Sequence, residues 1–517
     1  MSNVELFLDR HRISWEHNID RQLNPPRKFE GNPILEGEHS WEASFVAVYG
    51  NVLPREGGGF RIWYHAGAKG HQSDKMLCYA ESDDGFNWKR MMVSDQPYGG
   101  VSPTNIVLGP KPTVAVPCVI KNHHSDDPNE SLLLMFNSYV RDYPELTDVM
   151  QGAKRWCFVA TSPNGIAWSP PKGRLAIPGK ADCPISIVWD EVNRRYIAYL
   201  RGNRKPQPFD PNQWEPNAES AHVRYVRASV SRDFKHWSDP IEILRCDEGD
   251  NDPFGQIQQM AVTRRGGQFI GLLSLMNVLE YHWIEEHNLL MEEAATDTQL
   301  IVSRDGFHWD RVANRQTFLP LGAPNQWDSA WLVTQHSIVY NGDQMLFFYD
   351  ATNKGRGNMP AWNKKSPRTS NFRIGVAQLP RDRFQALRPR KLHLDGIIET
   401  KPLDVVEDSD LKLNVDATHG QVEVELVDYD GATIEGFSRT DCTAIEDNNG
   451  LDISVRWGDR TIAQATGLAA TRPPHVRVRI YLKQASLFAA DLPDENPWPV
   501  PREYGTTSDL EHMNPKA

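Results

Sequence analysis

One phrase recurs along the first three quarters of the chain, a short polar turn that ends in tryptophan. Its copies end at Trp88, Trp168, Trp237 and Trp309, and a degraded fifth copy occupies residues 377–384. The serine six residues before each Trp recurs at intervals of 80, 69 and 72 residues. That period is too long for a helical solenoid repeat, so each unit must hold several strands.

The phrase itself predicts a β-hairpin. Asp84-Gly85 and Asn164-Gly165 are residue pairs that tolerate positive φ and close tight turns, and short apolar runs precede them. We therefore expect each Trp to pack back on its sheet. The acids in this phrase, which include Asp84, Asp233 and Asp305, are predicted to be turn formers.

Two more strand-like runs precede each copy of the phrase. In the first unit they are residues 45–49 and 60–64, and in the third they are residues 185–189 and 196–200. Five units of three or four short strands predict an all-β fold. The expected architecture is a five-bladed β-propeller over residues 1–390, with the N-terminal segment 1–30 packing on it.

The pattern of apolar and polar residues changes after Pro389. Runs such as 421–427 and 476–482 alternate apolar with polar residues, which predicts an antiparallel β-sandwich over residues 391–490. Residues 491–517 are rich in proline and polar residues and predict a tail along the surface. Within the fourth unit, residues 282–293 are rich in helix formers. They predict a helical insertion that narrows the funnel at the centre of the propeller.

Composition excludes several classes of function. The chain has 56 Lys+Arg against 68 Asp+Glu, a net charge of -12, which argues against a nucleic-acid-binding surface. It contains no apolar run of the roughly 18 to 20 residues that a membrane span needs. The charged N-terminus argues against a signal peptide and predicts a cytoplasmic protein. The six scattered cysteines predict reduced thiols, and homo-oligomerisation is left open.

Three acids stand where innermost strands begin. A propeller forms its site where these strands start around a shared axis, and Glu42, Asp182 and Asp328 precede or open them in the first, third and fifth units. Glycosidic bond cleavage needs one protonated and one ionised carboxyl. We expect Glu42 and Asp182 to be the acid/base or nucleophile pair and Asp328 to bind substrate or tune a pKa. Each acid alone could equally cap a turn or pair with an arginine.

Further polar and aromatic residues lie beside these acids or at the corresponding strand ends. The expected substrate-binding residues are Trp41, His65, Arg201, Asp252, Gln256, Gln258, Trp327 and Tyr349. For His65 and Arg201, which end second strands, a purely structural pairing is about as well supported.

Metal and nucleotide sites find little support. The run Asp247–Asp252 offers oxygen donors for calcium but lacks the spacing of a known loop, so no cofactor is expected and structural calcium is the weaker alternative. His282 and His287 would lie roughly 140° apart on a helix, which disfavours a shared zinc ion. No G-x-S-x-G, P-loop or G-x-G-x-x-G motif occurs.

Several segments together resemble a known superfamily. They are Asn32-Pro33-Ile34-Leu35 followed by Trp41-Glu42, the Trp hairpins, Asp182 leading into Trp189-Asp190, Gln326-Trp327-Asp328, and Gly436-Phe437-Ser438. The chain resembles the five-bladed glycoside hydrolases of families 32, 43, 62, 68 and 130, and most of all the bacterial proteins called family-32-like glycosyl hydrolases. The resemblance implies a first-blade Asp, a second-blade Asp and a third-blade Glu. In this chain Glu42 occupies the first-blade position, the second-blade position has no acid, and Asp182 occupies the third-blade position.

The sequence therefore predicts a glycoside hydrolase that cleaves a terminal bond of an oligosaccharide and serves polysaccharide degradation. One alternative is a carbohydrate-binding propeller without catalysis. Another is a glycoside phosphorylase or polysaccharide lyase, which His65, Arg201 and Tyr349 keep open. A pair of carboxyls roughly 5 to 10 Å apart in one cavity would favour catalysis.

Overall fold

Strands dominate every part of the chain for which the fold is defined. A computed structural model describes residues 3–68, 74–139, 142–143, 155–169, 177, 182–204, 223–252, 254–284, 289–354, 371–466, 468 and 475–494. Within these ranges the helical turns are short 3-10 segments, among them Ser40–Glu42, Pro128–Glu130, Glu248–Asp250, Val312–Arg315 and Ile462–Ala465. The all-β prediction is confirmed. No described helix has the length and apolar character to cross a membrane.

Five antiparallel sheets follow one another along the chain. The first holds β5 (Phe45–Pro54), β6 (Phe60–Gly67), β7 (Lys75–Ser82), β8 (Lys89–Arg90) and β9 (Ile106–Leu108). The second holds β10 (Ala115–Lys121), β11 (Leu132–Tyr139) and β12 (Arg155–Ser162). The third holds β13 (Asp182–Asp190), β14 (Arg195–Arg204), β15 (Val223–Ser231) and β16 (Ile241–Leu244).

The fourth and fifth sheets complete the set. The fourth holds β17 (Gly255–Arg265), β18 (Gln268–Ile284), β19 (Leu289–Ser303), β20 (Asp310–Arg311) and β21 (Thr317–Leu319). The fifth holds β22 (Trp331–Asn341), β23 (Gln344–Thr352), β24 (Arg373–Pro380) and, from the N-terminal part of the chain, β4 (Arg27–Lys28). The chain runs from β4 into β5, so the pairing of β24 with β4 joins the fifth sheet to the first and closes the ring.

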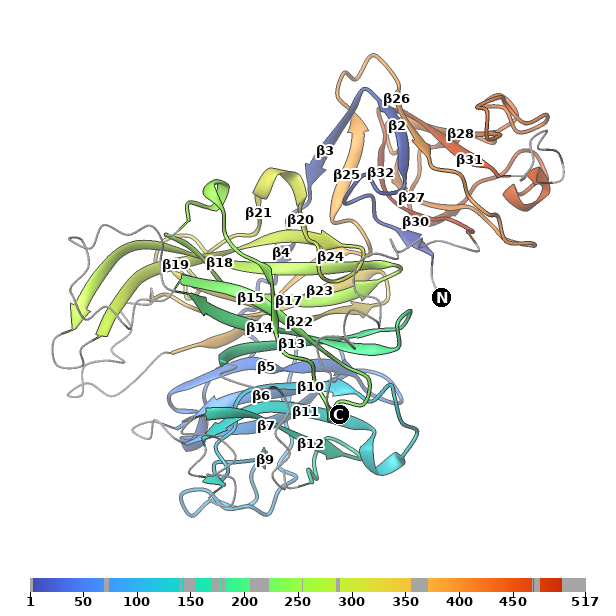
Figure 1. Ribbon diagram of the computed structural model, residues 1–517. Coiled ribbons are helices and arrows are strands. Elements are labelled where there is room, and N and C mark those ends of the chain that lie inside the picture. The colour runs from blue at the N-terminus through green and yellow to red at the C-terminus, as the bar shows by residue number, and fades with distance from the viewer. Residues whose placement is uncertain are drawn as a thin grey trace.

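The first strands of the five sheets form the centre of this body. Each contacts the first strands of two neighbouring sheets, in the order β5, β10, β13, β17, β22 and back to β5 (Figure 1). The apolar core is divided between the sheets: Ile62 and Tyr64 of the first sheet pack with Leu346 and Phe348 of the fifth. Burial of these faces is what holds neighbouring sheets together.

The repeated phrase forms the turn that the sequence predicts. In the first copy the Gly85 N–H donates to Ser82 Oγ at 2.9 Å, and Asp84 Oδ1 accepts from two following backbone N–H groups. The Trp88 indole donates back to the Gly85 carbonyl at 3.0 Å. Gly85, Gly165 and Gly306 have φ of 82° to 83°, a conformation that favours glycine.

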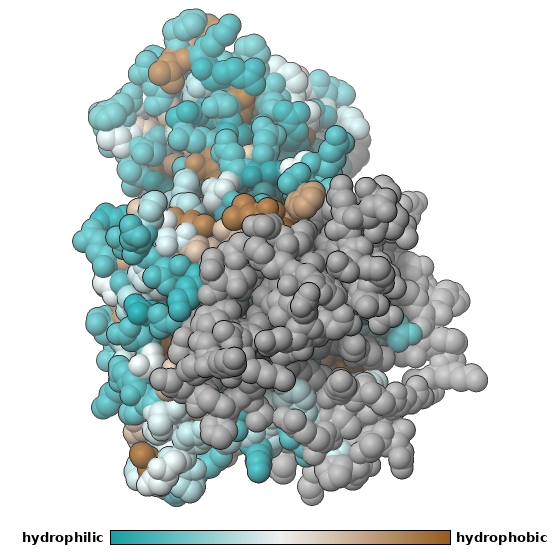
Figure 2. Space-filling model, turned by 90° about the vertical axis from the view of Figure 1, so that its left-hand side faces the viewer, coloured by the Kyte–Doolittle hydropathy of each residue, from teal (hydrophilic) through white to brown (hydrophobic). Residues whose placement is uncertain are grey.

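Two further sheets form a second body, which lies to one side of the ring in Figure 1. One holds β1 (Val4–Glu5), β3 (Ile19–Leu23), β25 (Gln385–Pro389), β27 (Lys412–Asp416), β30 (Asn449–Ser454) and β32 (Ser486–Asp491). The other holds β2 (Ile13–His17), β26 (Gly396–Thr400), β28 (Gln421–Val427), β29 (Ile445–Glu446) and β31 (Arg477–Lys483). Both contribute to one apolar cluster, and the face of this body that Figure 2 shows is mostly hydrophilic.

The N-terminal segment, predicted to pack on the ring, contacts both bodies. Val4, Leu8 and Leu23 share an apolar cluster with Ile270 and Phe347 of the fourth and fifth sheets. At the same time β1, β2 and β3 pair with β32, β26 and β25 of the second body, which the sequence did not predict. β4 joins the fifth sheet, and after the ring the second body resumes at Gln385 rather than at residue 391. Of the predicted tail, residues 495–517 lie outside the described part.

The predicted helix over residues 282–293 is wrong. His282 pairs with Met291 and Ile284 with Leu289, as the far end of the long β18–β19 hairpin. Pairing with the neighbouring strand overrides the local helix propensity of this segment. Residues 285–288, including the predicted His287, lie outside the described part.

Candidate functional site

Every first strand breaks register with the second strand of its sheet. The shifts fall between Ala47 and Asn51, Ala115 and Cys118, Asp182 and Ser186, Ile257 and Gln259, and Thr334 and Ile338. Such bulges redirect side chains and are common at the rims of barrels and beside active sites. They mark the end of the ring where the first strands begin, which is where a site was predicted.

The second strands carry a polar residue at one equivalent position. This position lies five residues after the residue that pairs with the hairpin serine, or with Leu379 in the fifth sheet. It is occupied by His65, Asn137, Arg201, Ser274 and Asp350. Two of them reach the next sheet, since Asp350 accepts from the Val48 N–H at 2.6 Å and Ser274 accepts from the Thr334 N–H at 3.3 Å. The position therefore ties sheets together.

His65 is enclosed at this position. Its side chain is buried, with the rings of Phe45 and Tyr49 centred 4.9 and 5.6 Å away. Burial, reinforced by Lys75, holds the pKa of His65 well below its ordinary value, so the ring is neutral at physiological pH. These contacts favour the structural alternative for His65 over a substrate contact.

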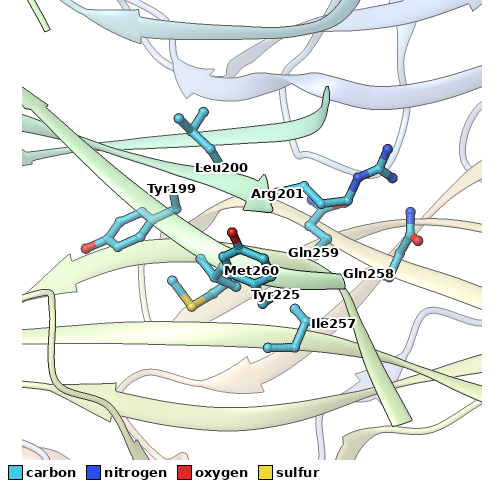
Figure 3. Close-up of a pocket in the computed structure, with 9 residues that line it drawn as sticks. Tyr199, Leu200, Arg201, Tyr225, Ile257, Gln258, Gln259 and Met260 are labelled. Carbon is cyan, nitrogen blue, oxygen red and sulfur yellow. The ribbon is translucent and has the colours of Figure 1, made fainter. Parts of the chain in front are cut away.

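Arg201 and Gln258, both predicted to bind substrate, do come together. They line a narrow cavity between the third and fourth sheets, and Figure 3 shows the Arg201 guanidinium and the Gln258 amide on one side of it, with Tyr199 and Met260 on the other. Its interior is about 10 Å³, roughly the space of one water molecule. The lining residues are Tyr199, Leu200, Arg201, Tyr225, Val226, Ile257, Gln258, Gln259 and Met260.

Arg224 is a site residue that the sequence did not reveal. It is buried on β15, and its Nη1 donates to Gln258 Oε1 and lies 3.5 Å from the sulfur of Met276. Its backbone N–H donates to Gln256 Oε1 at 3.4 Å, so one residue holds both glutamines. The only signal in the sequence is a positive charge inside a strand-forming run.

Asp182 begins β13 directly opposite Arg201 in the strand register. Its side chain lies outside the described part of the chain. The backbone alone places Asp182 in the same region as Arg201, Gln256 and Gln258.

Glu42 lies in a different environment. Its side chain is 0% exposed, and its oxygens accept from Tyr64 Oη at 2.5 Å and from Arg90 Nε at 3.0 and 3.2 Å. The backbone N–H groups of Glu38 and His39 donate to the same carboxylate. A carboxylate with both oxygens occupied and no exposed surface has no room for a sugar, so this geometry favours a structural role.

Trp41 belongs to the same buried network. Its indole N–H donates to Asn105 Oδ1 at 2.9 Å, and Asn105 Nδ2 donates to Tyr64 Oη at 2.5 Å. Burial, more than the neighbouring charges, raises the pKa of Tyr64 well above its ordinary value. Trp41 is 1% exposed, so it packs in the core of the first sheet rather than on a substrate.

Asp328, Trp327 and Tyr349 form a second cluster at the fifth sheet. Asp328 Oδ2 accepts from Lys28 Nζ at 2.6 Å and from Tyr349 Oη at 3.4 Å. The rings of Trp327 and Tyr349 are stacked with centroids 5.7 Å apart. Asn32 Nδ2 donates to Tyr349 Oη at 3.1 Å, which ties the N-terminal segment to the cluster.

Glu42 and Asp328 have separate partners in equivalent arrangements. Glu42 pairs with Arg90 of β8 and Asp328 with Lys28 of β4, and β8 and β4 are the outermost strands of their sheets along the main pairing order. Each acid stands three residues before the first strand of its sheet and also accepts from a tyrosine of the second strand, Tyr64 of β6 or Tyr349 of β23.

The acidic run is neutralised by arginines. Asp247 accepts two bonds of 2.8 Å from Arg315, and Asp250 pairs with Arg311 at 2.5 Å and with Arg315 at 2.8 Å. Asp252 ends this loop, and its N–H donates to the Asp247 carbonyl. Within the described ranges, no group of three His, Cys, Asp or Glu side chains is arranged to hold a metal ion.

Comparison with known proteins adds structural neighbours at low identity. No family model and no curated protein matches the chain. An N-acetylgalactosamine deacetylase from F. plautii, in complex with blood group B trisaccharide, is 14% identical, with a TM-score of 0.45 over 69% of this chain and 96% of that one. A structure from the GH130 family of mannoside phosphorylases, which contains glycoside hydrolases, is 13% identical, with a TM-score of 0.43 over 70% and 95%.

A third neighbour is a fructofuranosidase from Schwanniomyces occidentalis, 9% identical, with a TM-score of 0.38 over 90% of this chain and 96% of that one. Glycoside hydrolases and phosphorylases are thus represented among the structural neighbours. None of these three TM-scores reaches 0.5, and the proposals below rest on the residues of this chain.

Proposed function

We propose that the chain is a carbohydrate-active enzyme, in which the five sheets are the blades of a β-propeller and the two further sheets a β-sandwich. It acts on an oligosaccharide at the end of the ring where the first strands begin. The observation that carries the proposal is the meeting of Arg201, Gln256 and Gln258 beside the start of β13 at Asp182. Guanidinium and amide groups are the donors and acceptors that fix the hydroxyl groups of a sugar.

The proposed reaction is cleavage of a terminal glycosidic bond. Asp182 is the carboxyl that we assign to acid/base chemistry, because its register places it opposite Arg201. Glu42 and Asp328 are assigned to the framework, since both are buried and paired with cations. Hydrolysis then requires a second carboxyl within roughly 5 to 10 Å of the first.

Phosphorolysis is the second candidate, and the position of Arg201 opposite Asp182 favours it. When phosphate attacks the sugar, the protein needs one acid for the leaving oxygen and a cation that orients the phosphate. The same substrate would serve either reaction.

One assay separates these functions. The purified chain is incubated with a panel of oligosaccharides, with and without inorganic phosphate, and the products are resolved. A free sugar formed without phosphate indicates hydrolysis, and a sugar 1-phosphate formed only with phosphate indicates phosphorolysis. Binding without either product indicates a carbohydrate-binding propeller without catalysis and overturns the enzyme proposal.

Matched variants test the assignment of the acids. We expect Asp182→Asn to abolish product formation, while Glu42→Gln keeps the turnover of each folded molecule. The reverse result would overturn the assignment.

A further inference from the structure

We propose that the opposite end of the third sheet holds a second binding site, for an acidic saccharide. An open cavity of about 420 Å³ lies there, lined by His124, Trp189, Asn193, Arg194 and Arg232. None of these residues belongs to the site proposed above. They come from the loop after β10, the end of β13, the β13–β14 turn and the hairpin after β15.

The two sites are separated by the length of a strand. β13 runs from Asp182, at the end of the proposed enzymatic site, to Asp190, beside the turn that carries Asn193 and Arg194. The nine residues of β13 are joined by eight steps of about 3.3 Å, which span roughly 26 Å. A ligand in this cavity therefore does not reach the proposed reaction site.

Two guanidinium groups in the lining are available to a ligand. Arg194 and Arg232 are exposed, and neither makes an ion pair or hydrogen bond with any residue that the structure describes. An arginine fork matches the geometry of a carboxylate or a sulfate, with which it forms charge-assisted hydrogen bonds. The cavity thus has two positions for an oxyanion.

The acids nearby already have partners. Asp190 accepts from Arg195 Nε at 3.1 Å and from Asn193 Nδ2 at 2.8 Å. Asp233, next to Arg232 in the sequence, lies 2.7 Å from His236 Nδ1. Glu191 is exposed and lies 3.9 Å from Arg264, a long pairing, and it is not part of the lining. No carboxylate therefore lines the cavity among the described residues.

The remaining lining is rigid and polar. Trp189 is held between the ring of His123, parallel at 5.5 Å, and the ring of Tyr196 at 4.7 Å. His124 is fixed by a 3.0 Å contact between its Nδ1 and Tyr196 Oη. A site whose rings are fixed in advance loses little entropy when it binds a ligand.

The size and polarity of the cavity select the class of ligand. Its volume is within the range of about 300 to 1,000 Å³ that is typical of small-molecule sites, and it is far larger than an inorganic oxyanion needs. Four of the five lining side chains are polar or charged, which suits hydroxyl groups better than an apolar ligand. A saccharide that carries a carboxylate or a sulfate ester combines these properties.

The test is direct binding to the full chain. Isothermal titration is carried out with an oligouronate, a sulfated oligosaccharide, a neutral oligosaccharide of the same length, and inorganic phosphate. The variants are the double substitution Arg194→Gln/Arg232→Gln, the surface control Arg10→Gln, whose side chain is 71% exposed, and Gln258→Ala at the other end of the sheet.

We expect one or both acidic saccharides to bind, the double variant to lose at least tenfold in affinity, and Arg10→Gln and Gln258→Ala to bind as the native chain does. The relative affinity of the oligouronate and the sulfated ligand identifies the source of the oxyanion. An equal loss of affinity for the neutral oligosaccharide or for inorganic phosphate in the double variant, unchanged affinity for the acidic ligands in the double variant, or no binding of either acidic ligand would each overturn the proposal.

Discussion

Arg90 donates its Nε–H to both carboxylate oxygens of Glu42, at 3.0 and 3.2 Å, although the two residues are 48 positions apart. Both side chains are almost fully buried, with 7% and 0% exposed. A buried ion pair that loses one partner leaves an uncompensated charge, so such pairs are costly to break.

Glu42→Gln should therefore lower the free energy of unfolding by about 3 kcal/mol, because the Arg90 guanidinium loses its buried partner. Urea unfolding measures this loss. Glu38→Gln is the control, since Glu38 also pairs with Arg90 but its side chain is 61% exposed, and it should change stability by less than about 1 kcal/mol. Full stability in Glu42→Gln would contradict the structural role.

Asp350 should make the stability of the protein depend on pH. Burial raises its pKa well above the ordinary value, despite hydrogen bonds from the Val48 N–H and Gln335. The unfolded chain releases this proton near pH 4, so the contribution of Asp350 is complete below that pH and is lost as the pH rises through the folded pKa.

Replacing Asp350 by Asn removes this titration. We expect the unfolding free energy of Asp350→Asn to fall less than that of the native chain between pH 4 and pH 8, measured by urea unfolding at each pH. Asp343→Asn, an exposed acid in the adjacent turn, should follow the native curve. Parallel curves for all three proteins would contradict the prediction.

Gly165 tests how a hairpin packs on the neighbouring sheet. It has φ of 83°, and an added Cβ would lie 2.2 Å from Cζ2 of Trp63. Gly57 has φ of 85° with nothing within 4 Å, so Gly57→Ala has only the backbone cost of about 1 to 2 kcal/mol. Thermal unfolding should show Gly165→Ala to be less stable by a further 1 to 3 kcal/mol or so. Equal losses would contradict the packing.

Lys28 should be needed to close the ring. Lys28→Met leaves the buried Asp328 without its cation and should cost about 3 kcal/mol in urea unfolding. The neighbouring Arg27 pairs with Glu30 on the surface, where the side chains are 74% and 82% exposed, so Arg27→Met should be nearly neutral. An unchanged free energy of unfolding in Lys28→Met would contradict this role of Lys28.

Features that depend on local sequence could be predicted, and features that depend on distant partners could not. The hairpin at Ser82 follows from a turn whose hydrogen bonds all lie within a few residues. The ion pair of Asp328 with Lys28 joins residues 300 positions apart, and the sequence around Asp328 contains no pattern that predicts it. The sequence indicates that Glu42 and Asp328 precede strands, but not which distant residues pair with them.

The same distinction explains the other differences. Residues 282–293 contain helix formers, and only the partner strand makes them extended. Arg201 and Gln258 were found because they occupy repeat positions at strand ends, and they do line one cavity. Arg224 was missed because it belongs to no motif.

The first residues of the chain complete sheets that its last residues build: Leu23 pairs with Gln385, and Val4 with Asp491. During synthesis, β1 to β3 emerge first and wait for partners that are made about 360 to 490 residues later. A single cut after β24 leaves the strands of the ring together but divides the second body, because β1 to β3 stay on the ring fragment. The second body therefore cannot be removed, exchanged or expressed intact by truncation at one point, since the ring is inserted between its strands.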